Sequence, residues 1–273
     1  MALPSNFRRQ PEQRTFVGEC PEHGRVDRSE VEQFDGSRLV RPCKQCQWQG
    51  LRVEPVGSKA HTLALAYVTA EHRNSALIGS GITPRFADCK FSTYRATTPA
   101  MVEALEKCQS YAENFGEHYE AGRNLLLTGN VGTGKTHLAC SIIRHVLELN
   151  AVAVITTAAE IIRVFKRSMA RDAGYSEGDV INELASFDLL VIDELGAQAG
   201  TPYEIAVLHE VIDRRYNLVR PSVLISNLPA SAKAAATAEQ TLEQYIGTRA
   251  LDRLRENGAL LAGFTWASAR GRA

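Results

Sequence analysis

A short glycine-rich stretch carries the residues with the clearest chemical capacity. Residues 129–136 read GNVGTGKT and satisfy the spacing G-x-x-x-x-G-K-[ST]. Glycines at such positions let successive backbone N–H groups curl around a phosphate, because they adopt positive φ and admit the ligand closely. Lys135 then brings a positive charge to the β and γ phosphates, and the Thr136 hydroxyl is suited to ligate Mg²⁺. The nucleotide contacts predicted for this P-loop are Gly129, Asn130, Val131, Gly132, Thr133, Gly134, Lys135, Thr136 and His137.

The sequence on either side of the glycines has the order that a P-loop requires. Residues 125–127 form an apolar run typical of a buried strand, and residues 137–149 have helical periodicity. The dipole at the start of that helix favours an anion. An ordinary glycine-rich turn is the alternative, and the strand, loop, helix order disfavours it.

Two carboxylates end a second apolar run. Residues 186–196 read SFDLLVIDELG, so Asp193 and Glu194 stand at the carboxyl end of an expected strand. Asp193 would hold Mg²⁺ through water, and Glu194 would orient and deprotonate the attacking water. A strand that merely ends in polar residues is a weaker reading, given the P-loop upstream. Residues 222–226 form another expected strand, and Asn227 after it would stand beside the carboxylates if the two strands are neighbours.

The N-terminal part of the chain contains two pairs of metal-ligand types. Cys20 and His23 form a C-x-x-H pair, and after nineteen residues Cys43 and Cys46 form a C-x-x-C pair. Two such turns suit tetrahedral Zn²⁺, which would stabilise a segment with little core of its own. Four protein ligands leave no position for water, so a structural zinc is predicted rather than a catalytic one. Four unrelated residues are the alternative.

Composition bounds the class of protein. The 273 residues include 31 Lys plus Arg and 31 Asp plus Glu, so any nucleic-acid contact must come from a local patch. No apolar run is long enough to span a bilayer, and the N-terminus lacks a signal-peptide core, which favours a cytoplasmic protein. Cysteines in such a protein favour metal binding or buried thiols over disulfides. The cysteines expected to be buried are Cys89, Cys108 and Cys140.

Five apolar runs alternate with helical patterns after the N-terminal module. The strands are expected within residues 125–127, 152–156, 186–196, 222–226 and 259–264. The helices are expected at residues 99–115, 137–149, 158–171, 202–218 and 242–255. This alternation predicts an α/β fold with a five-stranded parallel sheet, helices on both faces and a ligand at the carboxyl ends of the strands. The expected division is a zinc-binding module over 1–54 with a tail over 1–15, a linker with a helix over 55–78, and the α/β domain over 79–273.

Two groups of basic residues leave alternatives open. The helix expected at 158–171 carries cations that could contact nucleic-acid phosphates or form an ordinary solvated face. These cations are Arg163, Lys166, Arg167 and Arg171. Arg214 and Arg215 could serve the nucleotide, DNA or an ion pair, and a solvated or paired role is the default.

Taken in order, the motifs resemble those of the DnaC-type AAA+ helicase loaders and, more distantly, the IstB-type transposition ATPases. The resemblance covers residues 78–272. The motifs that carry it are SGI at 80–82, FSTY at 91–94, GNVGTGKTH at 129–137, LLVIDELG at 189–196, IDRRYN at 212–217, SNL at 226–228 and GTRALDRLR at 247–255. It implies a P-loop AAA+ (ASCE) fold without a full helical lid, because few residues follow the last strand.

The resemblance also implies roles for individual residues. Asn227 is implied as sensor 1, and Arg253 as the arginine finger that reaches a neighbouring subunit's nucleotide, with Arg249 beside it. Arg270 falls at the sensor 2 position, where it would have to act from a short tail. The implied catalytic set is Lys135, Asp193, Glu194, Asn227 and Arg253.

The function implied is that of a Mg²⁺-dependent ATPase that loads a DnaB-type replicative helicase onto single-stranded DNA. Its subunits would associate through the ATP site, and the cations of residues 163–171 would contact DNA backbone phosphates. One alternative is a transposition helper on duplex DNA. A nucleotide-dependent binding module without turnover is another, which the intact Asp193, Glu194 and Arg253 disfavour. A metabolic kinase is disfavoured because no acceptor-binding insertion is found.

Overall fold

The computed structural model describes residues 13–20, 23–32, 38–40, 79–149, 151–170, 175–230 and 240–269. These residues fall into two compact units, one within residues 8–87 and one within residues 88–273. Several predicted features lie outside the described residues. They are the linker over 55–78, most of the tail over 1–15, Cys43, Cys46, Arg171 and Arg270. No helix of the described part is long and apolar enough to cross a membrane.

The N-terminal unit contains a small antiparallel sheet of strands in the order β1-β2-β3. The strands are β1 (Gln13–Cys20), β2 (Gly24–Glu32) and β3 (Arg38–Val40), and a 3₁₀ turn, η1 (Pro84–Phe86), also belongs to this unit. β1 begins inside the stretch expected as a tail. Phe16 and Val17 in β1 remain 36% and 61% exposed, so the hairpin of β1 and β2 buries little apolar surface. Sheets this small need additional support to be stable.

The second unit is built on a five-stranded sheet in the order β5-β6-β7-β4-β8, with every pair of neighbours parallel. Its strands are β4 (Leu125–Gly129), β5 (Ala153–Thr157), β6 (Leu189–Leu195), β7 (Ser222–Ser226) and β8 (Leu260–Phe264). The central strands are apolar on both faces because helices cover both sides. The predicted α/β fold with a parallel sheet is therefore confirmed.

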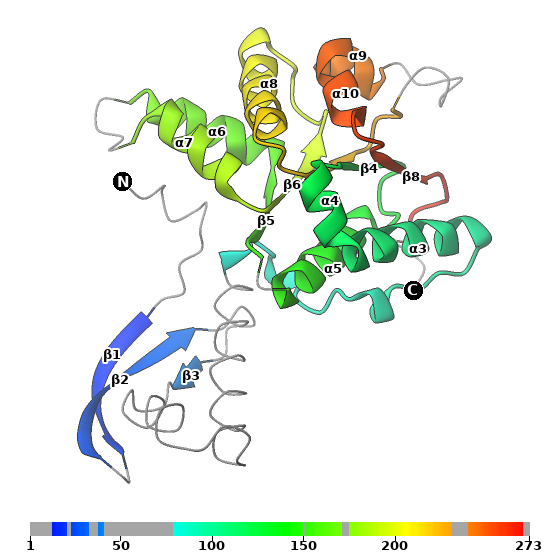
Figure 1. Ribbon diagram of the computed structural model, residues 1–273. Coiled ribbons are helices and arrows are strands. Elements are labelled where there is room, and N and C mark those ends of the chain that lie inside the picture. The colour runs from blue at the N-terminus through cyan, green and yellow to red at the C-terminus, as the bar shows by residue number, and fades with distance from the viewer. Residues whose placement is uncertain are drawn as a thin grey trace. The chain divides into compact units, whose positions relative to one another are not determined.

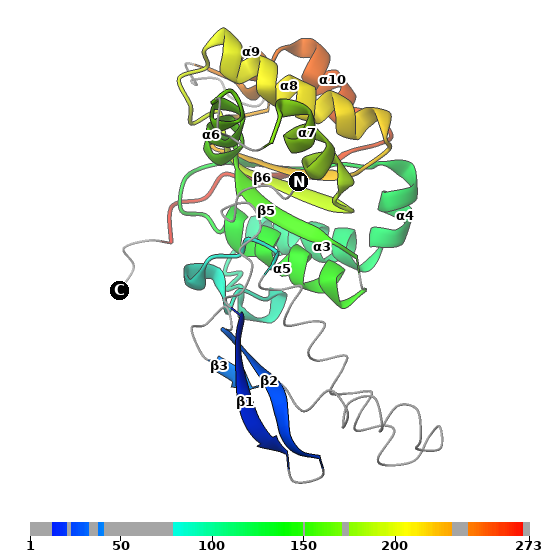
Figure 2. The same ribbon diagram turned by 90° about the vertical axis from the view of Figure 1, so that its left-hand side faces the viewer.

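Helices form a layer on each side of this sheet. One face is covered by α3 (Pro99–Glu113) and α5 (Lys135–Glu148), and the other by α6 (Ala158–Ser168), α7 (Glu177–Ser186) and α8 (Pro202–Asn217) (Figures 1 and 2). α10 packs on α8. The remaining helical elements are α4 (Phe115–Ala121), α9 (Leu242–Ile246), α10 (Thr248–Arg255) and the 3₁₀ turn η2 (Phe91–Thr93).

The helices differ from the predicted ones in four places, one of which is α4, a short helix that was not predicted. α7 was not predicted, although Ser176 and Asp179 form a capping box that marks its start. The helix expected over 242–255 is divided into α9 and α10 by Gly247, whose φ of 79° interrupts the helical backbone. The helix expected over 158–171 ends at Ser168.

Arg215 settles one of the alternatives that the sequence left open. Its side chain is only 1% exposed and reaches the start of two strands and the end of α7. The guanidinium donates to the Ser222 hydroxyl at 2.9 Å and to the carbonyls of Leu184, Phe187 and Pro221. Burial lowers its pKa to about 9. Arg215 is thus an internal cross-link of the fold, with its guanidinium enclosed by protein groups.

We predict that Arg215→Ala lowers the free energy of unfolding by about 3 kcal/mol, because it leaves several buried carbonyl groups without a donor. Urea unfolding of the full chain measures this. Arg214→Ala is the matched control, since the neighbouring arginine is exposed and its guanidinium donates to Asn182 Oδ1 at 3.2 Å. The control should stay within about 0.5 kcal/mol of the wild type. Equal losses in the two variants would contradict the cross-linking role.

Candidate nucleotide site

Strand β4 delivers the glycine-rich loop to the carboxyl edge of the sheet, and α5 begins at its end. Gly129 has a φ of 128°, and a Cβ there would lie 2.3 Å from the Phe264 carbonyl oxygen. Only glycine fits so close to β8. Gly134, with a φ of 95°, is the N-cap of α5, so the loop turns directly into the amino end of the helix. This is the backbone form that the motif predicted.

Lys135 lies inside the curled loop. Its side chain is 6% exposed, and Nζ donates to the carbonyl oxygens of Gly129 at 2.7 Å and Asn130 at 2.6 Å. The ammonium is therefore held over the loop, where a bound phosphate would meet both the positive charge and the backbone N–H groups of α5. Its contact with nucleotide phosphates stays a prediction.

Thr136, at the start of α5, contacts Asp193 of β6, although β6 and the strand before α5, β4, are not neighbours in the sheet. The Thr136 hydroxyl donates to Asp193 Oδ2 at 2.8 Å, and the Glu194 amide donates to Asp193 Oδ1 at 2.7 Å. Burial raises the pKa of the Asp193 carboxyl, while these two hydrogen bonds lower it. A hydroxyl and a carboxylate side by side are oxygen ligands of the type that Mg²⁺ takes in nucleotide sites. The two predicted Mg²⁺ ligands therefore lie together.

Glu194 has an unusual backbone at the end of β6. Its φ is 58°, and the register between β6 and β7 shifts between Ile192 and Leu195. A strained non-glycine residue persists only when its surroundings hold it, and here Ala197 N and Gln198 Nε2 both donate to the Glu194 carbonyl, at 3.1 Å and 3.0 Å. The strain turns the side chain out of the strand, and Glu194 is exposed at the sheet edge.

Asn227 immediately follows β7, which is the neighbour of β6. Because β6 and β7 are neighbours, Asn227 lies at the same edge of the sheet as Asp193 and Glu194. Its side chain is exposed. The edge thus presents a carboxylate toward Thr136, a second carboxylate toward solvent, and an amide on the adjacent strand.

Two aromatic side chains that the sequence did not single out fasten the P-loop. The Tyr94 hydroxyl and the Trp266 indole N–H both donate to the Thr133 carbonyl, each at 3.1 Å. Burial raises the pKa of Tyr94 to about 12, so this hydroxyl remains a donor through the physiological range. Tyr94 belongs to the FSTY motif, which had no assigned role, and nothing in the sequence pattern marked Trp266.

The segment after β8 lies along the same loop. Asn130 Nδ2 donates to the carbonyls of Thr265 at 2.9 Å and Trp266 at 3.1 Å, and the Ala269 amide donates to the Gly132 carbonyl at 2.9 Å. The residue before Arg270 therefore contacts the P-loop directly. Asn130 is the side chain that links the two segments.

His137 joins the start of α5 to the segment before α3. Its Nε2 lies 2.9 Å from the Lys90 carbonyl and 3.2 Å from Thr93 Oγ1, and its ring packs edge-on against Tyr94. Its contacts are to protein groups, while the predicted contact with the nucleotide stays a prediction. Val131 is 57% exposed at the tip of the loop.

The predicted arginine finger lies far from its own chain's P-loop. Arg253 in α10 pairs with Asp213 of α8, and the next residue, Leu254, accepts a hydrogen bond from Asn124 at 3.1 Å. Asn124 stands at the amino end of β4, whereas the P-loop follows its carboxyl end. The structure does not bring Arg253 and Lys135 together within one chain. Arg249 is exposed in the first turn of α10.

The predicted DNA contacts on α6 share its solvent face. Arg163 pairs with Glu160 in the preceding turn, and Lys166 Nζ lies 3.5 Å from Glu204 Oε1 of α8. Arg167 is exposed. Carboxylates therefore balance part of this charge, and both readings of the face, solvated or DNA-binding, stay open.

The four described cysteines are buried, and one of them, Cys20, lies beside a histidine. Cys20 Sγ lies 3.6 Å from His23 Nδ1. Among the described residues, which lack the other two predicted ligands, no group of three or more candidate metal ligands is found. Cys89, Cys108 and Cys140 are at most 8% exposed, which confirms their burial, and burial raises the pKa of each thiol.

A P-loop lysine inside its loop, a threonine bonded to a strand-end aspartate and the order β5-β6-β7-β4-β8 define a nucleotide-binding protein of the AAA+ class. Residues 81–261 match the family model of the IstB-like ATP binding proteins. The chain therefore belongs to this family.

Individual relatives agree with this membership. The chain is 33% identical to the replicative helicase loader DnaC of Escherichia coli K12 over 193 residues, which are 71% of this chain and 74% of that protein. It is 32% identical to YdaV of the same strain, over 70% of this chain and 71% of that protein. The resemblance to DnaC-type loaders is thereby confirmed.

Solved structures show the same fold. The crystal structure of the DnaC helicase loader has a TM-score of 0.57 at 20% identity, covering 66% of this chain and 99% of that chain. The crystal structure of DnaI has a TM-score of 0.52 at 20% identity, covering 69% of this chain and 94% of that one. The replication initiator DnaA bound to AMPPCP and single-stranded DNA has a TM-score of 0.52 at 18% identity, covering 66% of this chain and 50% of that chain.

We predict that substitutions of Tyr94 and Trp266 have non-additive effects on nucleotide binding, because both side chains donate to the Thr133 carbonyl. Tyr94→Phe or Trp266→Phe alone should weaken binding of a fluorescent ATP analogue by less than about twofold, because the other donor still satisfies the Thr133 carbonyl, so additive effects would give at most about fourfold in the double variant. The double variant should weaken it by about tenfold. Tyr119→Phe in α4 is the control. Additive losses, or equal losses in the control, would show that the two side chains do not act on one loop.

Proposed function

We propose that this protein is an ATP-dependent DNA replication helicase loader. It binds a DnaB-type replicative helicase and single-stranded DNA, and it couples loading and release to ATP hydrolysis. The 33% identity to the replicative helicase loader DnaC over 71% of the chain is the observation that carries the proposal. The hydrogen-bonded Thr136 and Asp193 supply, in the same domain, the two oxygen ligands that an ATPase would use to hold Mg²⁺.

The residues at the carboxyl edge of the sheet divide the hydrolytic work. Lys135 and the backbone amides of the P-loop bind the phosphates, and Thr136 with Asp193 would hold Mg²⁺. Bound Mg²⁺ would neutralise charge on the phosphate oxygens. Glu194, exposed and turned out of β6, accepts the proton of the attacking water, and Asn227 positions that water or senses the γ-phosphate.

Hydrolysis requires a second subunit in this proposal. Arg253 lies at the amino end of the sheet of its own chain, so it serves the nucleotide of a neighbour, with Arg249 beside it. Self-association through the ATP site follows. Arg270 acts as sensor 2 from the tail, and the hydrogen bond from Ala269 to Gly132 supports this by holding the preceding residue against the P-loop.

Single-stranded DNA is proposed to run along the exposed face of α6. Backbone phosphates would compete with Glu160 and Glu204 for the cations there. Both cations are more than half exposed, at 63% and 55%, so phosphates can reach them from solvent. The cations proposed for this contact are Arg163, Lys166, Arg167 and Arg171.

A structural zinc is proposed for the N-terminal module. A cysteine sulfur and a histidine nitrogen that share a tetrahedral zinc ion lie about 3.5 Å apart. The distance between Cys20 Sγ and His23 Nδ1 is 3.6 Å, which fits. The scant apolar burial of β1 gives such an ion a stabilising role. The other proposed ligands are Cys43 and Cys46, and the proposed module spans 1–54, before a linker over 55–78 and the ATPase domain over 79–273.

A transposition helper acting on duplex DNA is the second candidate, because the matching family model is that of the IstB-like ATP binding proteins. The two candidates share the ATPase and differ in the DNA that stimulates it and in the protein partner. A cytoplasmic location is proposed for either.

We predict that single-stranded DNA and a replicative helicase together stimulate steady-state ATP hydrolysis, and that the helicase co-purifies with the protein. Arg253→Ala should lower the stimulated rate by about 10³-fold, because a missing arginine finger leaves charge on the γ-phosphate unopposed. Arg255→Ala, an exposed residue of the same helix turn, is the control. Stimulation by duplex DNA alone, without helicase binding, would replace the loader with the transposition helper.

We predict about one equivalent of zinc per chain by elemental analysis of protein purified without added metal. Cys43→Ser should lose the metal, since a tetrahedral site with three protein ligands binds zinc less tightly, whereas Cys89→Ser should retain it. Full zinc content in the Cys43 variant would refute the proposed ligand set.

A further inference from the structure

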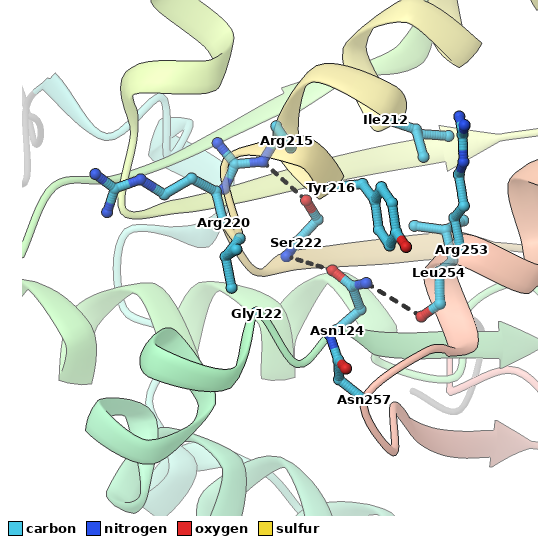
Figure 3. A pocket seen from close by; sticks show the side chains of 11 residues that line it. Gly122, Asn124, Ile212, Arg215, Tyr216, Arg220, Ser222, Arg253, Leu254 and Asn257 are labelled. Atoms are coloured by element: carbon cyan, nitrogen blue, oxygen red, sulfur yellow. Dashed lines mark hydrogen bonds between the residues drawn. The ribbon is translucent and has the colours of Figure 1, made fainter.

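The IDRRYN motif of α8 faces the last turn of α10. Asp213 and Tyr216 of this motif both contact Arg253. The Asp213 carboxylate forms an ion pair with the Arg253 guanidinium, and Arg253 Cζ lies 5.4 Å from the centre of the Tyr216 ring. The Tyr216 hydroxyl donates in turn to Glu256 Oε2 at 2.6 Å, just beyond α10. Figure 3 shows Tyr216 and Arg253 side by side at the rim of a pocket.

These contacts limit where the guanidinium can go. An arginine side chain has many rotamers, and a carboxylate on one side with an aromatic ring on the other selects a few of them. The Arg253 side chain is 19% exposed, so part of it still reaches the surface. A residue that must enter another subunit's active site works best when its direction is fixed beforehand.

The turn that carries Arg253 is itself fixed to the sheet. Asn124, 7% exposed, donates to the Leu254 carbonyl at 3.1 Å and accepts from the Ser222 amide at 2.8 Å (Figure 3). The backbone of α10 is thereby held by the starts of β4 and β7. The backbone beside Arg253 is anchored, and Asp213 then determines the direction of the side chain.

A contribution to stability does not by itself explain the ion pair. Asp213 is 38% exposed and Arg253 is 19% exposed, and an ion pair with one partner open to solvent contributes modestly to folding. The same helix already has an internal cross-link in the buried Arg215. Within the motif, Arg215 therefore stabilises the fold, while the ion pair between Asp213 and Arg253 is free to serve the position of Arg253.

We propose that Asp213 is a positioning residue for Arg253: its carboxylate, with the Tyr216 ring, holds the guanidinium in the direction in which it enters a neighbouring subunit's nucleotide site. This inference rests on the proposed function, in which Arg253 acts between subunits. It gives the IDRRYN motif a role in hydrolysis that is exerted on the neighbour and leaves the chain's own P-loop unaffected.

The test mixes two inactive proteins. Glu194→Gln subunits supply Arg253 but cannot activate water, and Arg253→Ala subunits retain Glu194 but supply no finger. ATP hydrolysis by the mixture, with single-stranded DNA and the replicative helicase present, comes from sites that combine one subunit of each kind. Asp213→Asn is then placed either on the Glu194→Gln subunit or on the Arg253→Ala subunit.

Asp213→Asn on the subunit that supplies Arg253 should lower the mixed rate by about tenfold with little change in KM, because the finger is misplaced. The same substitution on the other subunit should have no effect. Asp213→Glu on the supplying subunit should restore most of the rate. Glu210→Gln, an exposed carboxylate one turn earlier in α8, should leave the rate unchanged on either subunit.

Other outcomes separate the possible failures. Equal losses from both placements, or no loss from either, would overturn the positioning role while leaving the finger between subunits intact. A faster mixed rate would overturn it as well, because Asp213 would then restrain Arg253. If the parent mixture shows no hydrolysis above its components, the proposed action between subunits fails, and the role of Asp213 fails with it.

Discussion

The hydrogen bond between Thr136 and Asp193 is the interaction on which the rest of the site depends, because it joins the start of α5, which follows β4, to the end of β6. β4 and β6 are separated by β7 in the sheet, so neither strand pairing nor adjacency in sequence brings these residues together. The contact forms because the P-loop carries the chain across the sheet edge before α5 begins. Parallel strands with aligned carboxyl ends are what make this edge a single site.

The P-loop is fastened by segments from far apart in the sequence. Gly129 lies against the Phe264 carbonyl, the Thr133 carbonyl accepts from two aromatic residues, and the Ala269 amide donates to the loop. The segment after the last strand thus lies along the loop and holds it. The tail that holds the loop is the same segment that continues to the proposed sensor residue, so loop geometry and tail position are linked.

Local patterns were sufficient for the sheet and the loop but not for contacts that depend on the tertiary fold. Five apolar runs and the glycine spacing predicted the strands, the fold class and the position of Lys135, because burial on both faces and phosphate binding leave direct marks on a sequence. The role of Arg215 could not be predicted in this way. Most of its partners are backbone carbonyls at the end of α7 and just before β7, and a carbonyl has no sequence signature. Trp266 was missed for the same reason.

Adjacent residues of one helix turn show how packing assigns different roles to similar side chains. In α8, Arg215 faces the sheet and is buried, Arg214 faces solvent and bonds to Asn182, and Asp213 faces α10 and meets Arg253. Each is separated from the next by about 100° around the helix axis, so three consecutive residues reach three different environments. The motif is therefore one local sequence with several tertiary functions. Since the buried residue fixes the rotation of α8 against the sheet, it also fixes the direction in which Asp213 points.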